Sequence, residues 1–281
     1  MEQLYSDVSF RISELITKAY STSFSKAVSY LGTEKRKAIH SIYGFVRIAD
    51  EIVDTFHNHD KELLLARFEA DYYEAFEKNL SLNPVLHSFQ QVVKKYNIAD
   101  DLVKAFLKSM KADLGEIRFN HRDQINEYIF GSAEVVGLMC LMVFVDGDEK
   151  LYTELRGPAS KLGAAFQKVN FLRDLKHDTE MLDRNYFPEI SQGKFDESIK
   201  KQLVSDIETD FNESRRGISR LPDDTRLPVL VAYLYYRMLL NKIDRTPAER
   251  LFHKRIRVPD AVKLLLLIKA YFIDKLDRLK N

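Results

Sequence analysis

Apolar residues recur every three or four positions along most of this chain, which is the period of an amphipathic helix. Turn-forming residues separate the periodic segments, for example at Gly32 and at Asp146–Asp148. No segment alternates as a half-buried strand would, so the pattern predicts about ten helices and no strand. The predicted helices are Leu4–Val28, Glu34–Thr55, Lys61–Asn79, Pro84–Lys95, Ala99 to about Arg118, Gln124–Val145 with Asp123 as its N-cap, Glu149–Thr179, Phe195–Ser219, Leu227–Ile243 and Val258–Leu279.

Composition narrows the architecture to one all-α domain. The chain has 281 residues with only 10 Gly and 7 Pro, and no linker divides it. All-helical single domains reach this length. We therefore expect a single helical domain over residues 1–281.

Charge and cysteine content exclude several classes of protein. The net charge is +1, with 43 basic and 42 acidic residues, so the overall field does not favour nucleic acid as a partner. The lone Cys140 excludes an intramolecular disulfide, and its apolar neighbours predict a buried thiol in a reducing compartment. The first residues lack the basic and apolar regions of a signal peptide, and the apolar run Leu264–Ile273 is too short to span a bilayer. We expect a cytoplasmic protein, with peripheral contact at the inner membrane as the alternative.

Two aspartate pairs carry most of the functional information. The segments Arg47-Ile-Ala-Asp50-Glu-Ile-Val-Asp54 and Arg173-Asp174-Leu-Lys-His-Asp178 each place two aspartates four residues apart, on one face of a helix. Mg²⁺ in proteins is usually held by one or two carboxylates together with the phosphate oxygens of a substrate. Two such helices therefore predict a magnesium-dependent cleft that binds and ionises diphosphates.

The residues around these pairs strengthen the metal interpretation. A single pair of acidic residues at this spacing usually marks a solvated helix face. Here Arg47 shares the face of the first pair, and Gln167 and Asn170 share the face of the second, while the other directions of both helices are largely apolar. Both polar stripes are therefore expected to point inward.

Cations near the two pairs could stabilise the charge on a departing diphosphate. Arg47 and Arg173 are the closest in sequence, and Lys176 and Arg184 are weaker candidates. Arginine suits phosphate because its planar fork donates two hydrogen bonds at once. The alternative for Arg173 is an ordinary ion pair with a neighbouring aspartate. The basic segment Arg250–Arg257 could contact anionic lipid, although a solvated face is the more common meaning of such a segment.

A hydrophobic substrate channel is also indicated. Gly131–Met139 and Leu162–Phe166 mix small and apolar residues, which leaves room beside a helix for an alkyl chain or else permits close helix packing. Tyr43, Tyr128 and Tyr186 could offer a hydroxyl or a π face to a carbocation, or could simply pack in the core.

Several segments together resemble the squalene/phytoene synthase family, the head-to-head trans-isoprenyl diphosphate synthases. The similarity extends over nearly the whole chain, and its most specific part is the second aspartate segment with the residues that follow it. The matching segments are Ser21–Phe24, Lys37–Asp54, Met110–Leu114, Tyr128–Met139, Leu162–Asp178 and Asn185–Pro188.

The resemblance implies roles for individual residues. The aspartates would hold Mg²⁺ with the help of the two amides, Arg47 and Tyr186 would grip diphosphate, and Phe24 and Tyr128 would line the prenyl site. The expected metal ligands are Asp50, Asp54, Asn170, Asp174 and Asp178; the expected catalytic residues are Tyr43, Arg47, Asp50, Asp54, Asp174 and Asp178; and the expected substrate-binding residues are Ser21, Phe24, Arg47, Tyr128, Gln167, Asn170, Arg173 and Tyr186.

The resemblance also implies the isoprenoid synthase helical bundle and a prenyltransferase reaction. We expect two geranylgeranyl diphosphates to couple through a cyclopropylcarbinyl diphosphate to phytoene, in carotenoid biosynthesis, with Mg²⁺ or alternatively Mn²⁺. No NADPH is expected, since no glycine-rich dinucleotide fingerprint follows a strand. One alternative is C30 coupling of two farnesyl diphosphates to dehydrosqualene, presqualene diphosphate or squalene. Another is a non-catalytic assembly factor on the same scaffold. The sequence predicts no oligomeric state.

Overall fold

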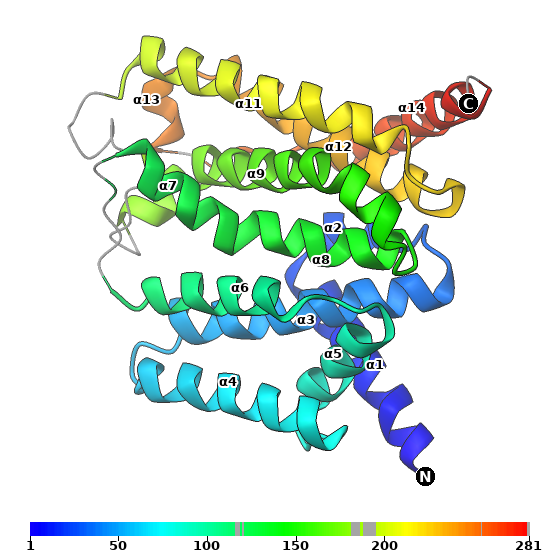
Figure 1. The fold of residues 1–281 in the computed structure, drawn as a ribbon. Helices are drawn as coiled ribbons and strands as arrows, with labels where there is room; N and C mark the ends of the chain where they lie inside the picture. Colours follow the sequence, from blue (N-terminus) through cyan, green and yellow to red (C-terminus); the bar gives the residue numbers. More distant parts are fainter. Residues whose placement is uncertain (116–118, 120, 181–185, 188–194, 254, 280–281) are drawn as a thin grey trace.

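In the computed structural model, which describes residues 1–115, 119, 121–180, 186–187, 195–253 and 255–279, every regular element is a helix. Figure 1 shows the helices stacked in layers, with α4 and α5 at one side of the bundle and α11 and α13 at the other. This arrangement confirms the predicted all-α class. The elements are α1 (Glu2–Tyr20), α2 (Thr22–Val28), α3 (Thr33–Asp54), α4 (Lys61–Lys78), α5 (Pro84–Lys95), α6 (Asp100–Ala112), α7 (Arg122–Ile129), the π-helical turn η1 (Phe130–Glu134), α8 (Val135–Phe144), α9 (Glu149–Glu180), α11 (Glu197–Ile218), α12 (Asp223–Asp244), α13 (Ala248–Leu251) and α14 (Asp260–Arg278).

The predicted first helix is in fact two helices. Ser21 leaves the helical conformation, with φ −143° and ψ 95°, and its Oγ accepts a hydrogen bond from the Phe24 backbone N–H at 3.4 Å. Serine is a favourable N-cap because its side chain satisfies one of the free N–H groups of the following helix. The apolar periodicity runs through this break, so it could not reveal it.

The predicted helix Gln124–Val145 begins earlier than expected. Its N-cap is His121, and Asp123 lies in the first turn, where a carboxylate still stabilises the positive end of the helix dipole. A π-helical turn interrupts it at η1. Such turns add one residue to a helical turn and are frequent at functional sites. The four-residue α13 was not predicted, because it is too short to show a period.

Among the described residues, one helix, Arg122–Phe144, is long and apolar enough to cross a membrane by length and composition, with a mean hydropathy of 1.6 over its apolar window. Half of that window is buried inside the bundle. Its α8 part packs against α3, α6 and α9, so a central place in the fold accounts for its apolar character.

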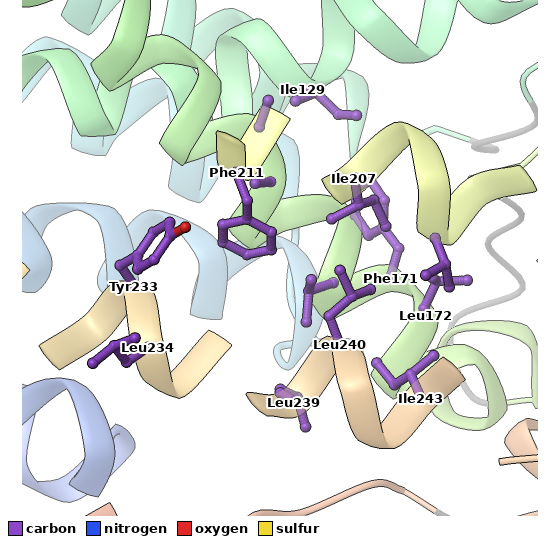
Figure 2. Close-up of a cluster of buried hydrophobic side chains, with 14 of the residues drawn as sticks. Ile129, Phe171, Leu172, Ile207, Phe211, Tyr233, Leu234, Leu239, Leu240 and Ile243 are labelled. Atoms are coloured by element: carbon purple, nitrogen blue, oxygen red, sulfur yellow. The ribbon is translucent and has the colours of Figure 1, made fainter. Parts of the chain in front are cut away.

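Two apolar clusters form the core. One gathers around Phe45 of α3, whose ring is fully buried and stacks on Phe89 with 4.0 Å between centroids. The other joins α9, α11 and α12. Figure 2 shows Phe211 of α11, Leu172 of α9 and Leu240 of α12 turned toward the same interior. Together the clusters fix α3 and α9, the two helices that carry the aspartate pairs.

Glycines let the central helices approach closely. A Cβ on Gly163 of α9 would lie 2.9 Å from the Ala133 carbonyl oxygen, and one on Gly217 of α11 would lie 2.4 Å from the Pro158 Cβ. Real Cβ atoms do not tolerate such distances. Small residues in these helices were predicted to give either a channel or close packing. They provide close packing, and Gly137, Gly163 and Gly217 also line a cavity.

Candidate active site

A cavity of about 530 Å³ lies between α2, α3, α8, α9, α11 and α12. Most of its wall is apolar, and the C-terminal halves of α3 and α9 contribute Arg47, Gln167, Asn170 and Arg173 to its polar part. A concave site of this size, mostly apolar with a few converging polar groups, is typical of a small-molecule site. The polar or aromatic-hydroxyl side chains on the wall are Tyr20, Ser21, Tyr43, Arg47, Ser132, Gln167, Asn170, Arg173, Ser214, Tyr236 and Arg255.

The lining residues of α9 form one continuous stripe. They recur every three or four positions from Leu155 to Arg173, and they change from apolar to polar at Gln167. At 1.5 Å per residue this stripe is about 27 Å long. The cavity is therefore an elongated channel with a chemically distinct polar end.

The aspartate pairs continue the lining stripes beyond this polar end. On α3 the lining residues end at Arg47, and Asp50 and Asp54 follow on the same face; on α9 they end at Arg173, and Asp174 and Asp178 follow. None of the four aspartates is among the side chains of the cavity wall. Both helices thus turn their acidic ends toward the same end of the channel.

On α3, one arginine lies between two carboxylates. The Arg47 Nη1 donates to Asp50 Oδ2 at 2.6 Å, and its other terminal nitrogen donates to Glu51. The Tyr20 ring covers the guanidinium, with 4.4 Å between its centroid and Cζ. Burial disfavours the positive charge of Arg47 and by itself would lower its pKa. The negative charges of Asp50 and Glu51 outweigh this effect, so the pKa of Arg47 is raised. Burial likewise opposes ionisation of Glu51, yet its hydrogen bond from Arg47 leaves the pKa of that carboxyl lowered.

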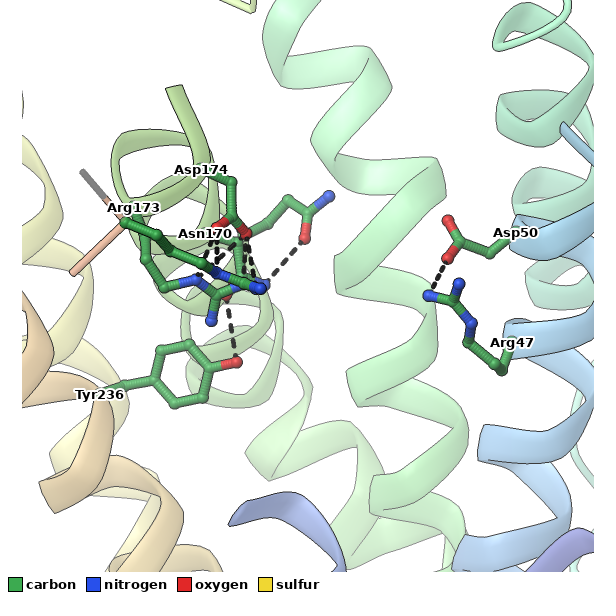
Figure 3. Close-up of polar contacts among 8 residues, drawn as sticks. Arg47, Asp50, Asn170, Arg173, Asp174 and Tyr236 are labelled. Atoms are coloured by element: carbon green, nitrogen blue, oxygen red, sulfur yellow. Dashed lines mark hydrogen bonds and ion pairs between the residues drawn. The ribbon is translucent and has the colours of Figure 1, made fainter. Parts of the chain in front are cut away.

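On α9, one carboxylate lies between two arginines. The Arg173 Nε is 3.1 Å from Asp174 Oδ1, and Arg255 Nε is 2.7 Å from the same oxygen. Burial opposes the charge on Arg173, but the hydrogen bond and charge of Asp174 dominate and raise the pKa of that guanidinium. Figure 3 shows this group and the Arg47–Asp50 pair on separate helices.

The predicted amides stand beside the α9 group. The Tyr236 hydroxyl donates to the Asn170 side-chain oxygen at 3.3 Å, and the Asn170 Nδ2 donates to Gln167 at 3.5 Å. The chain from Tyr236 through Asn170 to Gln167 fixes both amides on the cavity wall. Burial raises the pKa of Tyr236, so its hydroxyl keeps its proton at neutral pH.

Ser21, Phe24 and Tyr43 meet at the α2 side of the cavity. The Phe24 and Tyr43 rings stack with 5.1 Å between centroids, and all three residues line the wall. Burial raises the pKa of the Tyr43 hydroxyl. The structure therefore brings together seven of the residues predicted to act on substrate, namely Ser21, Phe24, Tyr43, Arg47, Gln167, Asn170 and Arg173.

Tyr128 and Tyr186 are not among the side chains of the cavity wall. Both are buried, and Tyr186 stacks on Phe171 with 3.8 Å between ring centroids. The Tyr128 hydroxyl donates to Asp113 at 3.1 Å. Both pack with aromatic partners, which is one of the two alternatives that the sequence left open for these tyrosines. Lys176 is exposed on α9, while Arg184 and Asn185 lie outside the described residues.

Several polar residues of the cavity wall were not predicted as site residues. Tyr20 and Tyr236 line the polar end, and Arg255, expected in a solvated or lipid-facing basic segment, instead contacts Asp174. The only signal for Arg255 was its charge. Its partner is 81 positions away in the chain, so local spacing could not identify the contact.

The predicted ligands fit Mg²⁺ in chemical type, since the four aspartates and Asn170 offer carboxylate and amide oxygens. On α3, Asp54 is the last helical residue and Asp50 lies one turn earlier, where the negative end of the dipole disfavours a carboxylate and a nearby cation offsets this cost. Among the described residues no three His, Cys, Asp or Glu side chains are grouped closely enough to hold a metal by themselves. A metal would thus need ligands from the substrate as well.

Residues 17–261 match the squalene/phytoene synthase family. The chain belongs to this family. Among curated relatives, the chloroplastic phytoene synthase of an Oncidium hybrid cultivar is 30% identical over 91% of this chain, and the chain covers 66% of that protein. Phytoene synthase of the cyanobacterium Arthrospira platensis is 26% identical over 92% of this chain and 91% of its own length. Membership confirms the predicted family and enzyme class, a prenyltransferase.

Solved structures confirm the fold of this family. A dehydrosqualene synthase in complex with ligand has a TM-score of 0.84 at 24% identity, covering 97% of this chain and 98% of the other. A squalene synthase from Alicyclobacillus acidocaldarius has a TM-score of 0.75 at 19% identity, covering 90% of this chain and 97% of the other. These similarities establish the isoprenoid synthase helical bundle.

Proposed function

We propose that this chain is a phytoene synthase that couples two geranylgeranyl diphosphates head to head. The product would form through prephytoene diphosphate, the cyclopropylcarbinyl intermediate, with release of two diphosphates. The observation that carries this proposal is the elongated cavity described above, which is apolar over most of its length, with arginines and amides at the end where the aspartates of α3 and α9 follow. Such a cavity matches a long hydrocarbon with a charged head.

The polar end suits the departure of diphosphate. Charge builds on the leaving oxygens as the allylic C–O bond breaks, and donors already held in place stabilise that charge most effectively. Arg47, Arg173 and Arg255 offer guanidinium forks there, with Asn170 and Gln167 as further polar contacts. Mg²⁺, when bound by Asp50, Asp54, Asp174 and Asp178, would add Lewis-acid stabilisation of the same oxygens.

The apolar wall suits the carbocation that remains. The double bond of the second substrate would attack C1 of the cation, closing the cyclopropane, and a second ionisation and rearrangement would follow. The stacked Phe24 and Tyr43 rings line this wall at its α2 side, and Tyr43 lies one turn of α3 before Arg47. Such rings attract cations, and the dry apolar wall keeps water from capturing the cation.

The length of the channel supports a C20 substrate. An extended chain advances about 1.2 Å per bond, so the main chain of a geranylgeranyl group is about 19 Å long and that of a farnesyl group about 14 Å. The lining stripe of α9 is about 27 Å long, which leaves room for the longer group and its diphosphate. The shorter group would also enter, so C30 coupling of farnesyl diphosphate remains the second candidate.

We propose that the reaction needs no reductant. The final cation would lose a proton, which leaves a conjugated triene at the centre of the product. We also propose that the protein is cytoplasmic. Peripheral contact at the inner membrane is part of the proposal, because the product is a hydrocarbon.

Mass spectrometry of extracts tests this proposal. Purified protein would be incubated with Mg²⁺ and either geranylgeranyl or farnesyl diphosphate, with and without NADPH. A C40 hydrocarbon with a conjugated triene at its centre, formed from geranylgeranyl diphosphate without NADPH, is the expected result. A C30 product in its place would transfer the function to the second candidate, and no product from either substrate would contradict both and favour a non-catalytic assembly factor.

A further inference from the structure

The outward face of the last helix, α14, is unusually apolar. Leu265 is 64% exposed, Phe272 60% and Leu279 78%. Single exposed apolar residues are normal on a protein surface, whereas a contiguous group marks an interaction site. The remaining members of this face are Leu264, Ile268, Tyr271 and Leu276, each about half exposed.

These residues form one stripe along the helix. Their spacing places them within an arc of about 140° over some 22 Å of helix. The opposite side, with Leu266 and Ala270, is buried against the bundle, where α14 packs on α12. Figure 1 shows α14 at the edge of the bundle beside α12. One face of α14 is thus buried against the bundle, and a second apolar face is exposed on the outside.

The charges on α14 are divided by sign. Lys269 and Lys275 are exposed on or beside the apolar stripe and make no ion pair within the described part of the chain. Two acids face the other way: Asp274 lies 2.9 Å from Arg278 Nε, and Asp277 lies 2.6 Å from Arg215. The outward face of the C-terminal half is therefore apolar and positively charged.

The helix also lies close to the cavity. The α12 helix separates the two, with Val229, Ala232 and Tyr236 on the cavity wall and its other side against α14. At the start of α14, Asp260 is near enough to Lys26 of α2 for the lysine to contribute to lowering the pKa of that carboxyl, after the larger effect of Lys263. The α2 helix lines the cavity as well.

We propose that the outward face of α14 is the surface by which this protein binds a bilayer containing anionic lipid. An amphipathic helix with an apolar face and lysines beside it lies in the headgroup region, with its apolar side chains inserted and its lysines at the phosphates. The interpretation rests on the proposed function, because only a hydrocarbon product requires a bilayer one helix layer from the cavity.

The charge pattern favours a bilayer over a second copy of the chain. A helix pairing with its copy uses a narrow seam, and here an unpaired Lys275 lies within the stripe. Next to an anionic surface the same lysine is stabilising, because each basic residue there adds attraction of about 1 kcal/mol, or roughly fivefold in binding.

Flotation with vesicles tests this surface. The purified chain would be mixed with vesicles of phosphatidylcholine alone or enriched in phosphatidylglycerol, and the bound fraction measured. We expect binding to the enriched vesicles and its loss, by about tenfold or more, in a variant with Leu265→Glu and Phe272→Glu. A variant with Lys269→Glu and Lys275→Glu should lose the preference for phosphatidylglycerol. Flotation of all variants at the level of the original chain would overturn the proposal.

A control on α1 separates the surface from general charge effects. Leu4 and Leu15 are 67% and 66% exposed on α1, and Leu4→Glu with Leu15→Glu adds the same charge at a distance from α14. This variant should float like the original chain. Light scattering tests whether a second copy of the chain covers this face instead. If the chain does not float with vesicles but forms a dimer that the α14 substitutions dissociate, the proposal is overturned. Diphosphate release in detergent, measured separately, shows whether the variants still turn over substrate.

Discussion

The helices α3 and α9 both carry an aspartate pair beside one cavity, yet their charge balances differ. On α3 a single cation, Arg47, is shared by Asp50 and Glu51, whereas on α9 a single acid, Asp174, is shared by Arg173 and Arg255. The α3 face has acid in excess and should attract a divalent cation more strongly. The α9 face has two arginines to balance Asp174 and Asp178, and it should hold the diphosphate more strongly.

The two helices also differ in how they are held. The α3 helix is fixed by large rings, with Phe45 in contact with Phe68, Tyr72, Phe89 and Phe106. The α9 helix is also held by rings, since Phe166 stacks on Tyr236 and Phe171 on Tyr186, but in addition its backbone approaches η1 closely at Gly163. Rings and glycines both position a helix, but a glycine contact is broken by a single added carbon. The aspartates of α9 should therefore be the more sensitive to changes in packing.

Neutralising the aspartates should have the largest effect. Asp50→Asn and Asp174→Asn are each expected to lower kcat/KM by about 10²–10³-fold at saturating Mg²⁺, the usual loss when a group stabilising developing charge is removed. Asp50→Asn should raise the Mg²⁺ concentration needed for activity. Asp174→Asn should lower kcat together with KM, because it frees two arginines for the diphosphate. Steady-state diphosphate release measures all of these.

The exposed Asp71 of α4 supplies a matched control, and Asp71→Asn should leave turnover unchanged. Full activity of Asp50→Asn or Asp174→Asn in saturating Mg²⁺ would contradict the metal assignment. Identical Mg²⁺ and substrate dependences in the two variants would contradict the proposed difference between the helices.

A substitution at Gly163 probes the packing difference. Gly163→Ala should destabilise the fold by about 1–3 kcal/mol, because its Cβ would be forced against the backbone of η1. Gly157, on the same helix, has nothing within 4 Å of an added Cβ, so Gly157→Ala should stabilise the fold by about 0.5–1 kcal/mol. Urea denaturation of both variants measures the free energies of unfolding. Equal effects would show that the close approach at Gly163 does not hold α9.

Removing Arg255 tests the contribution of the second arginine beside Asp174. Arg255→Ala should lower kcat/KM about tenfold, mainly through KM, since a guanidinium hydrogen-bonded to a charged group is worth about 1.5–3 kcal/mol. Arg255→Lys should recover only part of the loss, because lysine keeps the charge but not the planar fork. An unchanged KM in Arg255→Ala would place this arginine outside the substrate site.

The smallest effect is expected at Tyr236. Tyr236→Phe removes one hydrogen bond to Asn170 and should lower kcat/KM a few-fold, corresponding to about 0.5–1.5 kcal/mol. Tyr235, whose ring contacts Lys263 instead, offers the control Tyr235→Phe with no expected loss. A loss above a hundredfold at Tyr236 would mean that the hydroxyl takes part in the chemistry rather than in orienting the amide.

The spacing of residues along the chain was enough to predict the positions of the helices and the residues that share a helix face. The period of apolar residues located α3 and α9 to within one residue at either end, and the spacing of Asp50 and Asp174 predicted helix faces that the structure turns toward one channel. The break at Ser21 was missed because the apolar period is continuous across it. Contacts that depend on tertiary structure were missed too: Arg255 reaches Asp174 only in the folded chain. Tyr128 and Tyr186 pack with Phe171, a choice of neighbours that spacing does not encode.

The most direct test of the central claim is a crystal structure with Mn²⁺ and a non-hydrolysable geranylgeranyl thiodiphosphate. The account predicts anomalous peaks for Mn²⁺ between the thiodiphosphate and the Asp50–Asp54 and Asp174–Asp178 pairs, and an alkyl chain along the α9 stripe toward Leu155. Metal or analogue bound elsewhere, with the channel between α3 and α9 empty, would contradict it.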